Sequence, residues 1–201
     1  MIAIIDYGAG NLKSVNHALN DLGFQTEITD NPKKLYEADA LVLPGVGAFK
    51  DAMDQLHALN FIDSIKENVQ AGKPILGICL GLQLFYEKSY EHGEWTGLGL
   101  LEGEVVRFDQ QLKVPHMGWN QLVEGTNSCF HEVLQKNEYV YFVHSYYVKP
   151  KNVDEVLYWT DYGVKVPAIV KKENIIGMQF HPEKSGDTGK KLLKVFGELI
   201  K

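Results

Sequence analysis

Short apolar runs alternate with amphipathic stretches through the first half of the chain. Runs of strand length occur at 2–6, 24–29, 40–43 and 74–78. Apolar residues recur every three or four positions at 11–22 and 49–69, a spacing typical of helices, and the second helix is expected to break near Asn60. Because strands and helices alternate, the pattern predicts an α/β protein with a mainly parallel sheet and helices on both faces.

The second half of the chain is richer in strands. Further strands are expected at 104–108, 139–143, 156–160, 166–170 and 175–180, followed by an amphipathic helix at 188–200. The 201 residues contain no internal repeat, linker or low-complexity segment. We therefore expect a single domain, residues 1–201, built as a three-layer α/β/α sandwich.

Composition argues against several classes of function. The formal net charge is −6 and Arg107 is the only arginine, so a nucleic-acid partner is not expected, since binding a phosphate backbone needs a basic face. The apolar runs are too short for a membrane span, and the N-terminal sequence lacks the basic start of a signal peptide. Two cysteines, Cys79 and Cys129, make no disulfide framework, so a cytoplasmic location is expected. No spacing of cysteine and histidine indicates a zinc site.

Cys79 has the sequence setting of a catalytic nucleophile. It lies between an apolar strand and a stretch with helical spacing, 80–87. A strand-to-helix turn presents a nucleophile at a sharp bend, and Gly77 and Gly81 would permit the tight backbone. The start of a helix favours a thiolate, and the N–H of Leu80 is a candidate oxyanion donor. The alternative is a buried structural cysteine, the commoner role of a lone cysteine.

A distant His181-Pro182-Glu183 tripeptide contains the other groups that acyl transfer needs. The nucleophile requires a base that takes its proton, and the base requires a group that orients it. His181 and Glu183 are two residues apart at the end of an expected strand, so an extended backbone would place both side chains on one face. The carboxyl ends of strands are where active sites form in open α/β sheets. We therefore interpret Cys79, His181 and Glu183 as nucleophile, base and orienting carboxylate.

Two glycine-containing turns follow the first and third expected strands. The Gly-Ala-Gly-Asn sequence at 8–11 invites a dinucleotide-binding interpretation, but Lys13 stands where that fingerprint needs glycine or alanine. A tight turn with Asn11 near the helix cap is favoured instead. The Pro-Gly-Val-Gly sequence at 44–47 lies where elbow hydrolases place a second oxyanion donor, and an ordinary turn is its alternative.

Two further polar elements are candidates for a pocket near Cys79. Gln83 lies one helical turn after Cys79, so its amide is expected to face the same side. The His-Ser-Tyr sequence at 144–146 ends a strand and offers polar groups to a small polar substrate. Each is, alternatively, an ordinary surface or core element. Four histidines without a partner in sequence are assigned to the surface or core: His17, His57, His92 and His131.

The segment 77–83 together with 181–183 resembles the class I, triad-type glutamine amidotransferases. Four further segments in the expected order narrow the resemblance: 6–12, 43–49, 115–120 and 181–185. Within that family, they resemble the glutaminase subunits of imidazole glycerol phosphate synthases, which serve histidine biosynthesis.

This resemblance implies a flavodoxin-like class I glutamine amidotransferase fold and a glutaminase that needs no metal or cofactor. Cys79 would attack the side-chain amide of glutamine, and His181 would protonate the leaving ammonia. Water activated by His181 would then hydrolyse the thioester. The N–H of Leu80 and the turn formed by Val46 and Gly47 would stabilise the oxyanion.

The resemblance also implies residues that bind the substrate and a partner. The positions that bind glutamine in the family match Gln83, His144, Ser145 and Tyr146. The implied partner is a (β/α)8-barrel cyclase, which would form a heterodimer with this subunit and receive the ammonia. The candidate interface residues are Asn11, Lys13, Trp119, Asn120 and Lys184.

Val46 departs from the family pattern, because most class I relatives carry a second glycine at this position. A preformed oxyanion hole is therefore not expected. We predict that the isolated chain is nearly inactive until the partner and its nucleotide ligand reorient this peptide.

Three alternatives remain from the sequence. A glutaminase that serves pyridoxal phosphate or purine synthesis would share the triad and differ in the motifs at 117–120 and 184–185. A stand-alone cysteine hydrolase or peptidase would work without a partner and would need a larger cleft. In a non-catalytic flavodoxin-like binding module, no activity would depend on Cys79.

Overall fold

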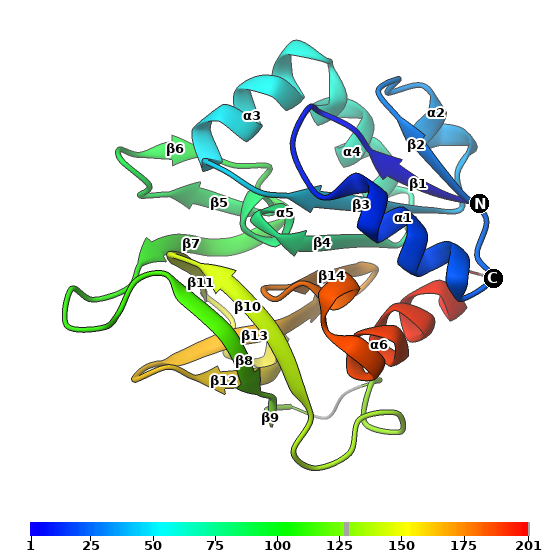
Figure 1. The fold of residues 1–201 in the computed structure, drawn as a ribbon. Helices are drawn as coiled ribbons and strands as arrows, with labels where there is room; N and C mark the ends of the chain where they lie inside the picture. Colours follow the sequence, from blue (N-terminus) through cyan, green and yellow to red (C-terminus); the bar gives the residue numbers. More distant parts are fainter. Residues whose placement is uncertain (127–128, 201) are drawn as a thin grey trace.

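An eight-stranded mixed sheet runs through the centre of the molecule (Figure 1). The computed structural model describes residues 1–126 and 129–200. The strand order is β2 (Thr26–Thr29), β1 (Ile2–Ile5), β3 (Ala40–Gly45), β4 (Ile75–Cys79), β14 (Ile175–Met178), β13 (Lys165–Lys172), β12 (Val156–Asp161) and β9 (Val123–Glu124). The strands from β2 to β14 are parallel, as expected, and β13, β12 and β9 extend the sheet in antiparallel fashion.

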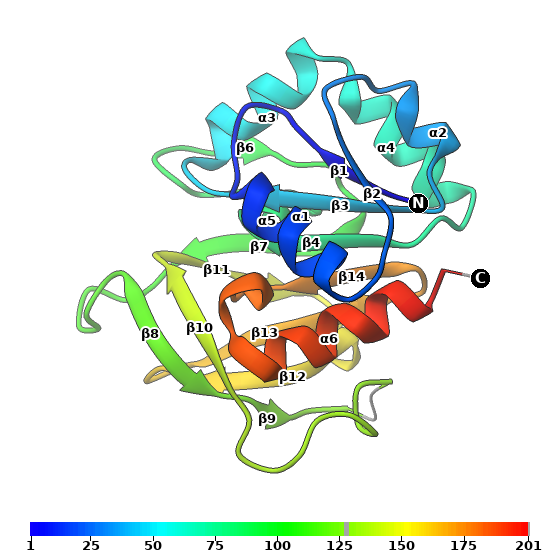
Figure 2. The same ribbon diagram turned by 45° about the vertical axis from the view of Figure 1, so that its right-hand side comes forward.

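Helices cover both faces of the parallel strands (Figures 1 and 2). One face carries α1 (Leu12–Asp21) and α6 (Gly186–Glu198), and the other carries α2 (Lys34–Glu37), α3 (Phe49–Ala58) and α4 (Phe61–Gln70). Along β1, Ile2 and Ile4 pack in the core under α1 and α6. Ala3 and Ile5 pack in the core under α2, α3 and α4. Because both faces are covered, β1 is apolar at every position. Asn60 separates α3 from α4 with a left-handed φ of 58°, which confirms the expected break.

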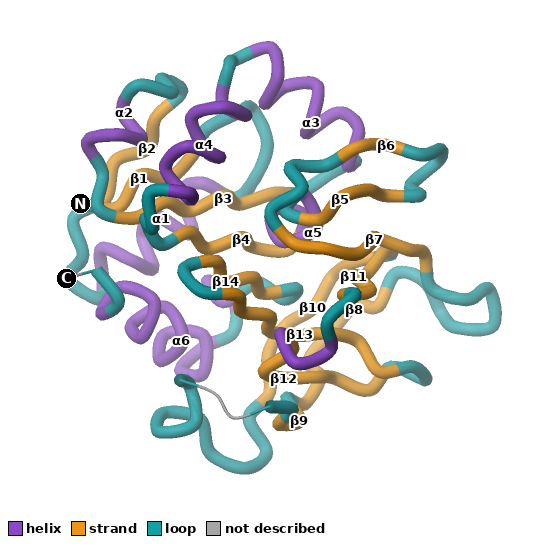
Figure 3. Tube along the Cα trace, turned by 180° about the vertical axis from the view of Figure 1, so that it is seen from behind, coloured by secondary structure: helices purple, strands orange, loops and turns teal. Residues whose placement is uncertain are grey.

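Two smaller sheets lie beside the central sheet (Figure 3). One has the order β11 (Tyr146–Pro150), β7 (Leu101–Arg107), β5 (Tyr86–Ser89) and β6 (Trp95–Thr96). The other is a two-stranded ribbon of β10 (Tyr139–His144) and β8 (His116–Gln121). A short 3-10 helix, η1 (Val153–Glu155), precedes β12. The chain passes from β10 to β11 at Ser145, and so from one small sheet to the other.

The prediction of a helix at 80–87 is wrong in the length of the helix. The helix α5 spans only Leu80–Leu84, and Tyr86 begins β5. The Leu98 N–H donates to the Leu84 carbonyl oxygen at 2.8 Å, where a longer helix would place an N–H of its own. Because β5 pairs with β6 and β7, the strand is specified by distant residues rather than by local periodicity.

Candidate active site

Cys79 lies at a sharp bend between β4 and α5, the placement expected of a nucleophile. Its φ of 54° and ψ of −109° lie outside the regions that a non-glycine residue normally occupies. Strain of this kind persists only where the surrounding structure imposes it, and it is concentrated at functional sites. The bend therefore favours the prediction that Cys79 is functional over the alternative of a buried structural cysteine.

Three glycines are required by close packing around this bend. A Cβ on Gly81 would lie 1.8 Å from the Leu43 carbonyl oxygen. A Cβ on Gly77 would lie 2.5 Å from the Phe85 ring, and one on Gly45 would lie 2.8 Å from the Gly81 nitrogen. Gly77 and Gly81 do not have a left-handed φ. They are needed because there is no space for a side chain, rather than for conformational freedom.

The sheet register brings two other parts of the chain to Cys79. In the β3–β4 ladder Gly45 is the partner of Cys79, so the turn at Val46 and Gly47 starts beside the nucleophile. Gly47 has a φ of 97°, which favours glycine, and the Val46 side chain is 45% exposed. The β4–β14 ladder ends at Met178, so the segment that follows β14 also reaches the nucleophile.

His181 and Glu183 are in contact, although not through an extended backbone. β14 ends before the tripeptide, and the 3-10 helix η2 (Pro182–Lys184) begins within it. His181 Nδ1 donates to the Glu183 carboxylate at 2.9 Å, and the two side chains are 3% and 1% exposed. The Ser185 hydroxyl holds the turn, because it donates to the His181 carbonyl at 2.7 Å and accepts from the Tyr141 N–H at 3.0 Å. The expected contact is thus made by a turn.

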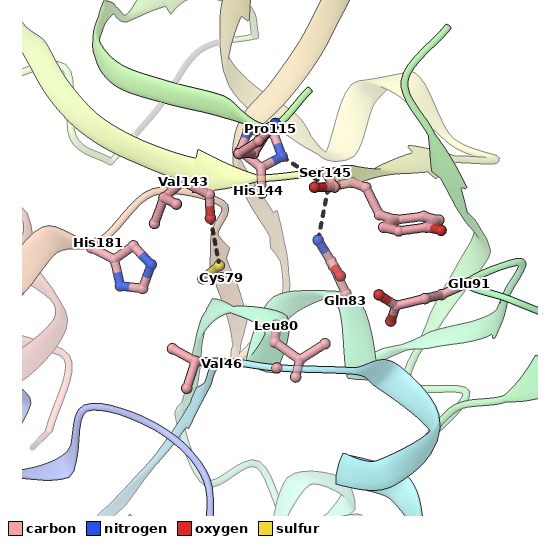
Figure 4. Close-up of a pocket in the computed structure, with 12 residues that line it drawn as sticks. Val46, Cys79, Leu80, Gln83, Glu91, Pro115, Val143, His144, Ser145 and His181 are labelled. Carbon is pink, nitrogen blue, oxygen red and sulfur yellow. Dashed lines mark hydrogen bonds between the residues drawn. The ribbon is translucent and has the colours of Figure 1, made fainter. Parts of the chain in front are cut away.

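The His181 ring lies beside the nucleophile (Figure 4). Burial lowers the pKa of His181, but the neighbouring Cys79 and Glu183 act in the opposite direction and raise it to about 10. Nε2 is buried and makes no hydrogen bond to any described residue. The Cys79 thiol donates to the Val143 carbonyl oxygen at 3.8 Å, and the Gln179 amide donates to Sγ at 3.9 Å. The His181 ring can therefore hold a proton released by Cys79.

Cys79 and His181 open into a cavity of about 410 Å³, a size suited to a small metabolite. The cavity is lined by Val46, Gly47, Cys79, Leu80, Gln83, Glu91, Pro115, Val143, His144, Ser145, Tyr146 and His181. Every residue expected to bind substrate or to form the oxyanion hole is among them. This volume does not favour the larger cleft that a peptidase would need.

Two polar residues at the site were not identified from the sequence. Glu91 follows β5, and its carboxylate accepts a hydrogen bond from the N–H at the start of α3 at 2.6 Å. No local motif marks it. Gln179 accepts from the Gln83 amide at 3.2 Å and reaches Cys79. Its position at the carboxyl end of the strand expected at 175–180 is a signal that could have indicated it, since active sites in open α/β sheets form at such ends.

Comparison with known proteins agrees with this geometry. The family model described as "Glutamine amidotransferase class-I" matches residues 3–198. The chain belongs to the class I glutamine amidotransferase family. The resemblance inferred from the motifs is thereby confirmed.

Relatives of this amidotransferase extend over its full length. The imidazole glycerol phosphate synthase subunit HisH of Oceanobacillus iheyensis is 53% identical over 202 residues, which cover 100% of both chains. The subunit HisH of Aquifex aeolicus is 51% identical over 194 residues, 96% of this chain and 94% of that one.

Solved structures confirm the expected fold. A crystal structure of a glutamine amidotransferase has a TM-score of 0.78 at 22% identity and covers 100% of this chain and 99% of its own. The structure of PurLQS from Thermotoga maritima has a TM-score of 0.77 at 22% identity and covers 100% and 98%. These identities are too low to indicate more than a shared fold.

Within residues 1–126 and 129–200, the amidotransferase has no group of three or more His, Cys, Asp or Glu side chains placed to hold a metal ion. Over the same residues, no helix is long and apolar enough to cross a membrane.

The candidate interface residues of the amidotransferase differ in accessibility. Three have exposed side chains: Lys13, Trp119 and Lys184. Asn11 is half-buried where α1 begins. The Asn120 amide already donates to the Asp161 carbonyl at 2.8 Å and contacts His116 Nε2 at 3.2 Å. The donors of the Asn120 amide are thus used within the chain, and its place at an interface stays a prediction.

Two buried histidines are expected to make the folded amidotransferase sensitive to acid. His116 and His144 are 2% and 6% exposed, and burial lowers their pKa values to about 4 and about 3. Both titrate at about 6.5 in an unfolded chain. Below pH 6.5 the unfolded state therefore binds more protons, and stability falls as the pH falls. We expect the free energy of unfolding to drop by about 3 kcal/mol or more between pH 7 and pH 4, since one pKa unit is worth about 1.4 kcal/mol.

Urea unfolding at several pH values measures this loss. A His116→Phe variant provides the comparison, because it removes one of the two titrating rings and keeps an aromatic side chain. A variant whose stability falls as steeply as that of the wild type would contradict the assignment to His116.

Proposed function

We propose that this chain is the glutaminase subunit of an imidazole glycerol phosphate synthase. It hydrolyses L-glutamine to L-glutamate and ammonia, and it passes the ammonia to a cyclase subunit that makes imidazole glycerol phosphate and aminoimidazole-carboxamide ribonucleotide in histidine biosynthesis. The activity is carried by one observation, the pair of His181 and Glu183 beside Cys79 at a cavity of about 410 Å³. The pathway is supported by relatives 53% and 51% identical to this chain, both named imidazole glycerol phosphate synthase subunit HisH.

In the first step, the Cys79 sulfur bonds to the side-chain amide carbon of glutamine, and the amide oxygen becomes an oxyanion. The Leu80 N–H and the turn at Val46 and Gly47 line the cavity and are the candidate donors to it. The proton that Cys79 gives up is held on His181 and passes to the leaving nitrogen. The C–N bond then breaks, and ammonia and a γ-glutamyl thioester on Cys79 are the products.

In the second step, water replaces ammonia at the same carbon. His181 takes a proton from the water as its oxygen bonds to the thioester carbon, and the same donors stabilise the second oxyanion. The C–S bond breaks, glutamate leaves, and the proton on His181 returns to the Cys79 sulfur. Glu183 keeps the imidazole in one orientation through both steps.

Glu91 is the cavity residue best suited to hold the α-ammonium group of glutamine. Its carboxylate lines the cavity and is fixed by the N–H at the start of α3. Replacing Glu91 with glutamine keeps an oxygen for that N–H and removes the charge. Because a hydrogen bond to a charged group contributes about 1.5–3 kcal/mol, we expect the KM for glutamine to rise by about 10- to 100-fold with little change in kcat.

Steady-state kinetics of Glu91→Gln measure this effect, with Glu94→Gln as the matched control. Glu94 is an exposed carboxylate in the same loop. An unchanged KM in Glu91→Gln, or an equal rise in both variants, would show that Glu91 does not bind the substrate.

The β8–β10 ribbon presents the surface that we assign to the cyclase partner. Met117 and Trp119 alternate along β8 with less exposed residues, and they are 62% and 57% exposed. Tyr139 on β10 lies on the same face, because it pairs with Gln121, and is 49% exposed. Large apolar side chains gathered on one exposed face indicate a protein contact. Lys184, exposed beside the proposed triad, is suited to pair with an acidic group of the partner.

The turn at Val46 is the element that we expect the partner to control. Val46 is 45% exposed, so it is open to contact from outside, and it also lines the cavity. If this peptide donates to the oxyanion only in the complex, the isolated chain lacks one donor. Loss of one such donor costs about 10²- to 10³-fold in rate.

Ammonia and glutamate release from glutamine tests the proposal. It is measured for the chain alone, with the barrel cyclase, and with the cyclase and its ribonucleotide ligand. We expect stimulation of about 100-fold or more in the last case, which corresponds to one additional oxyanion donor. Hydrolysis that is indifferent to this partner would assign the chain to another amidotransferase pathway. Absence of hydrolysis under all three conditions would overturn the proposed activity.

A further inference from the structure

A chain of hydrogen bonds runs from the β8–β10 ribbon to the wall of the cavity. Asn120 Nδ2 and His116 Nε2 are 3.2 Å apart, and His116 Nδ1 and His144 Nε2 are 2.9 Å apart. His144 Nδ1 lies 2.8 Å from the Tyr146 carbonyl oxygen. Both imidazoles are buried, and the two reaction steps use neither of them as an acid or a base.

The groups at the two ends of this series of hydrogen bonds determine which atom donates in each of them. The Tyr146 carbonyl can only accept, so His144 carries its proton on Nδ1 and its Nε2 accepts. At the other end, the Gln121 N–H donates to Asn120 Oδ1 at 2.8 Å, so the Asn120 amide nitrogen is the group that donates to His116 Nε2. His116 therefore carries its proton on Nδ1 and donates it to His144. The two ends require the same tautomers.

The Tyr146 carbonyl oxygen connects this series of hydrogen bonds to the proposed substrate site. The Gln83 amide donates to the same oxygen at 2.9 Å. Gln83 also donates to Gln179, whose amide reaches Cys79. Ser145, next to Tyr146, lines the cavity. The polypeptide passes from one small sheet to the other at this residue. The orientation of one carbonyl group thus determines the position of both the Gln83 side chain and this wall.

We propose that His116 is a positioning residue for glutamine binding, because its Nδ1–H holds His144 in the tautomer that donates to the Tyr146 carbonyl. This inference rests on the proposed function. In the other tautomer, the lone pair of His144 Nδ1 would face the carbonyl oxygen at 2.8 Å, and the two atoms would repel each other. The wall formed by residues 144–146 would shift, and the Gln83 amide would lose its acceptor.

Two substitutions can separate the effect of the His116 Nδ1–H from the effect of its ring on packing. The ring stacks on Phe142 at a centroid distance of 4.7 Å and on Tyr162 at 4.0 Å. His116→Phe keeps an aromatic ring between these neighbours and removes the donor. His116→Asn keeps an N–H at the position of Nδ1 and removes most of the ring. A packing role predicts damage in His116→Asn, whereas a positioning role predicts damage in His116→Phe.

Glutamine kinetics of the complex with the cyclase and its ribonucleotide distinguish these roles. For His116→Phe we expect the KM to rise about tenfold and kcat to stay within about twofold, since one neutral hydrogen bond is worth about 1 kcal/mol or slightly more. His116→Asn should keep a KM within about threefold of the wild type. His57→Phe, at an exposed histidine on α3, is the control for introducing phenylalanine at a histidine position.

Nitrogen NMR of the full chain with ¹⁵N-labelled histidine reads the tautomers directly. In the wild type and in His116→Asn, we expect His144 to be protonated on Nδ1 alone. In His116→Phe we expect a mixture of both tautomers. This measurement does not depend on turnover, so it also applies if a variant is less stable than the wild type.

Three outcomes would overturn the inference. The first is an unchanged KM in His116→Phe, and the second is an equal rise in KM in His116→Phe and His116→Asn. The third is a His144 tautomer that is the same in the wild type and in both variants. Each would show that His116 does not position His144. These differ from failure of the proposed function, which would appear as a wild-type complex that does not hydrolyse glutamine.

Discussion

Replacing Cys79 with alanine is expected to lower glutamine hydrolysis by at least about 10⁴-fold. The variant has no sulfur to form the thioester. Among the described residues that line the cavity, the other hydroxyl or thiol groups are those of Ser145 and Tyr146, which have no hydrogen bond to His181. Glutamate release by the complex, assayed with saturating glutamine, measures the loss. If the proposed cyclase is the partner, its reaction driven by added ammonium salt should continue, because that reaction would not pass through Cys79.

Cys129→Ala is the matched control for Cys79→Ala. Cys129 is exposed, whereas Cys79 is buried at the bend. An alkylating glutamine analogue should add its mass to Cys79 in the wild type and in the Cys129→Ala variant, and to neither cysteine in Cys79→Ala. Residual hydrolysis within about 100-fold of the wild-type rate in Cys79→Ala would contradict the thioester mechanism.

Replacing His181 with asparagine is expected to lower kcat by at least about 10³-fold. Asparagine retains a donor for Glu183 but neither takes nor gives a proton, and both steps of the proposed reaction need that transfer. Glu183→Gln should cost less, because it leaves the imidazole in place and weakens only its orientation and charge. Single-turnover assays of ammonia release separate the first step from the second in each variant.

Stability measurements on the same variants give an independent test of His181. Its folded-state pKa of about 10 lies above the unfolded value of about 6.5. The proton on His181 therefore stabilises the fold fully below pH 6.5, and this stabilisation is lost as the pH rises to about 10. His181→Asn should lack this alkaline loss, while His17→Asn, at an exposed histidine on α1, should retain it.

A kcat of His181→Asn within about tenfold of the wild type would rule out the role of base.

The first half of the fold was predictable because its elements are specified locally. β1 and β4 are apolar at every position because helices cover both faces, and such runs are recognisable without their partners. The break at Asn60 follows from a residue type that tolerates a left-handed φ.

In the small sheets, β7 and β10 were predicted from the local pattern, whereas β5, β6, β8 and β11 were not. The strand β8 shows the reason, because its alternation is inverted. Its exposed positions are the apolar Met117 and Trp119, and its inward positions include the polar His116 and Asn120. The inward polar groups are satisfied by hydrogen bonds to β10 and β12, so the strand is stable although its pattern does not resemble an amphipathic strand.

The proposed triad could be recognised because its members lie in short motifs. Glu91 could not, since its place at the site depends on a hydrogen bond to α3, far away in sequence. The route by which Glu183 reaches His181 was also not predictable, because the strand ends at Met178 and a 3-10 turn replaces the extended backbone. Residue types and their spacing were thus sufficient to predict the candidate reacting groups. The contacts that support these groups depend on long-range packing and were not predictable.

For a protein engineer who wishes to adapt this pocket to a longer or shorter amide, the bend at Cys79 leaves little room for change. On the side of the bend, Gly45, Gly77 and Gly81 each face atoms that a methyl group would meet at 2.8 Å or less. Saturation libraries at these positions should return glycine almost exclusively. The wall at 143–146 hangs from a crossing between two small sheets rather than from the central sheet, so useful diversity for new substrates is concentrated there.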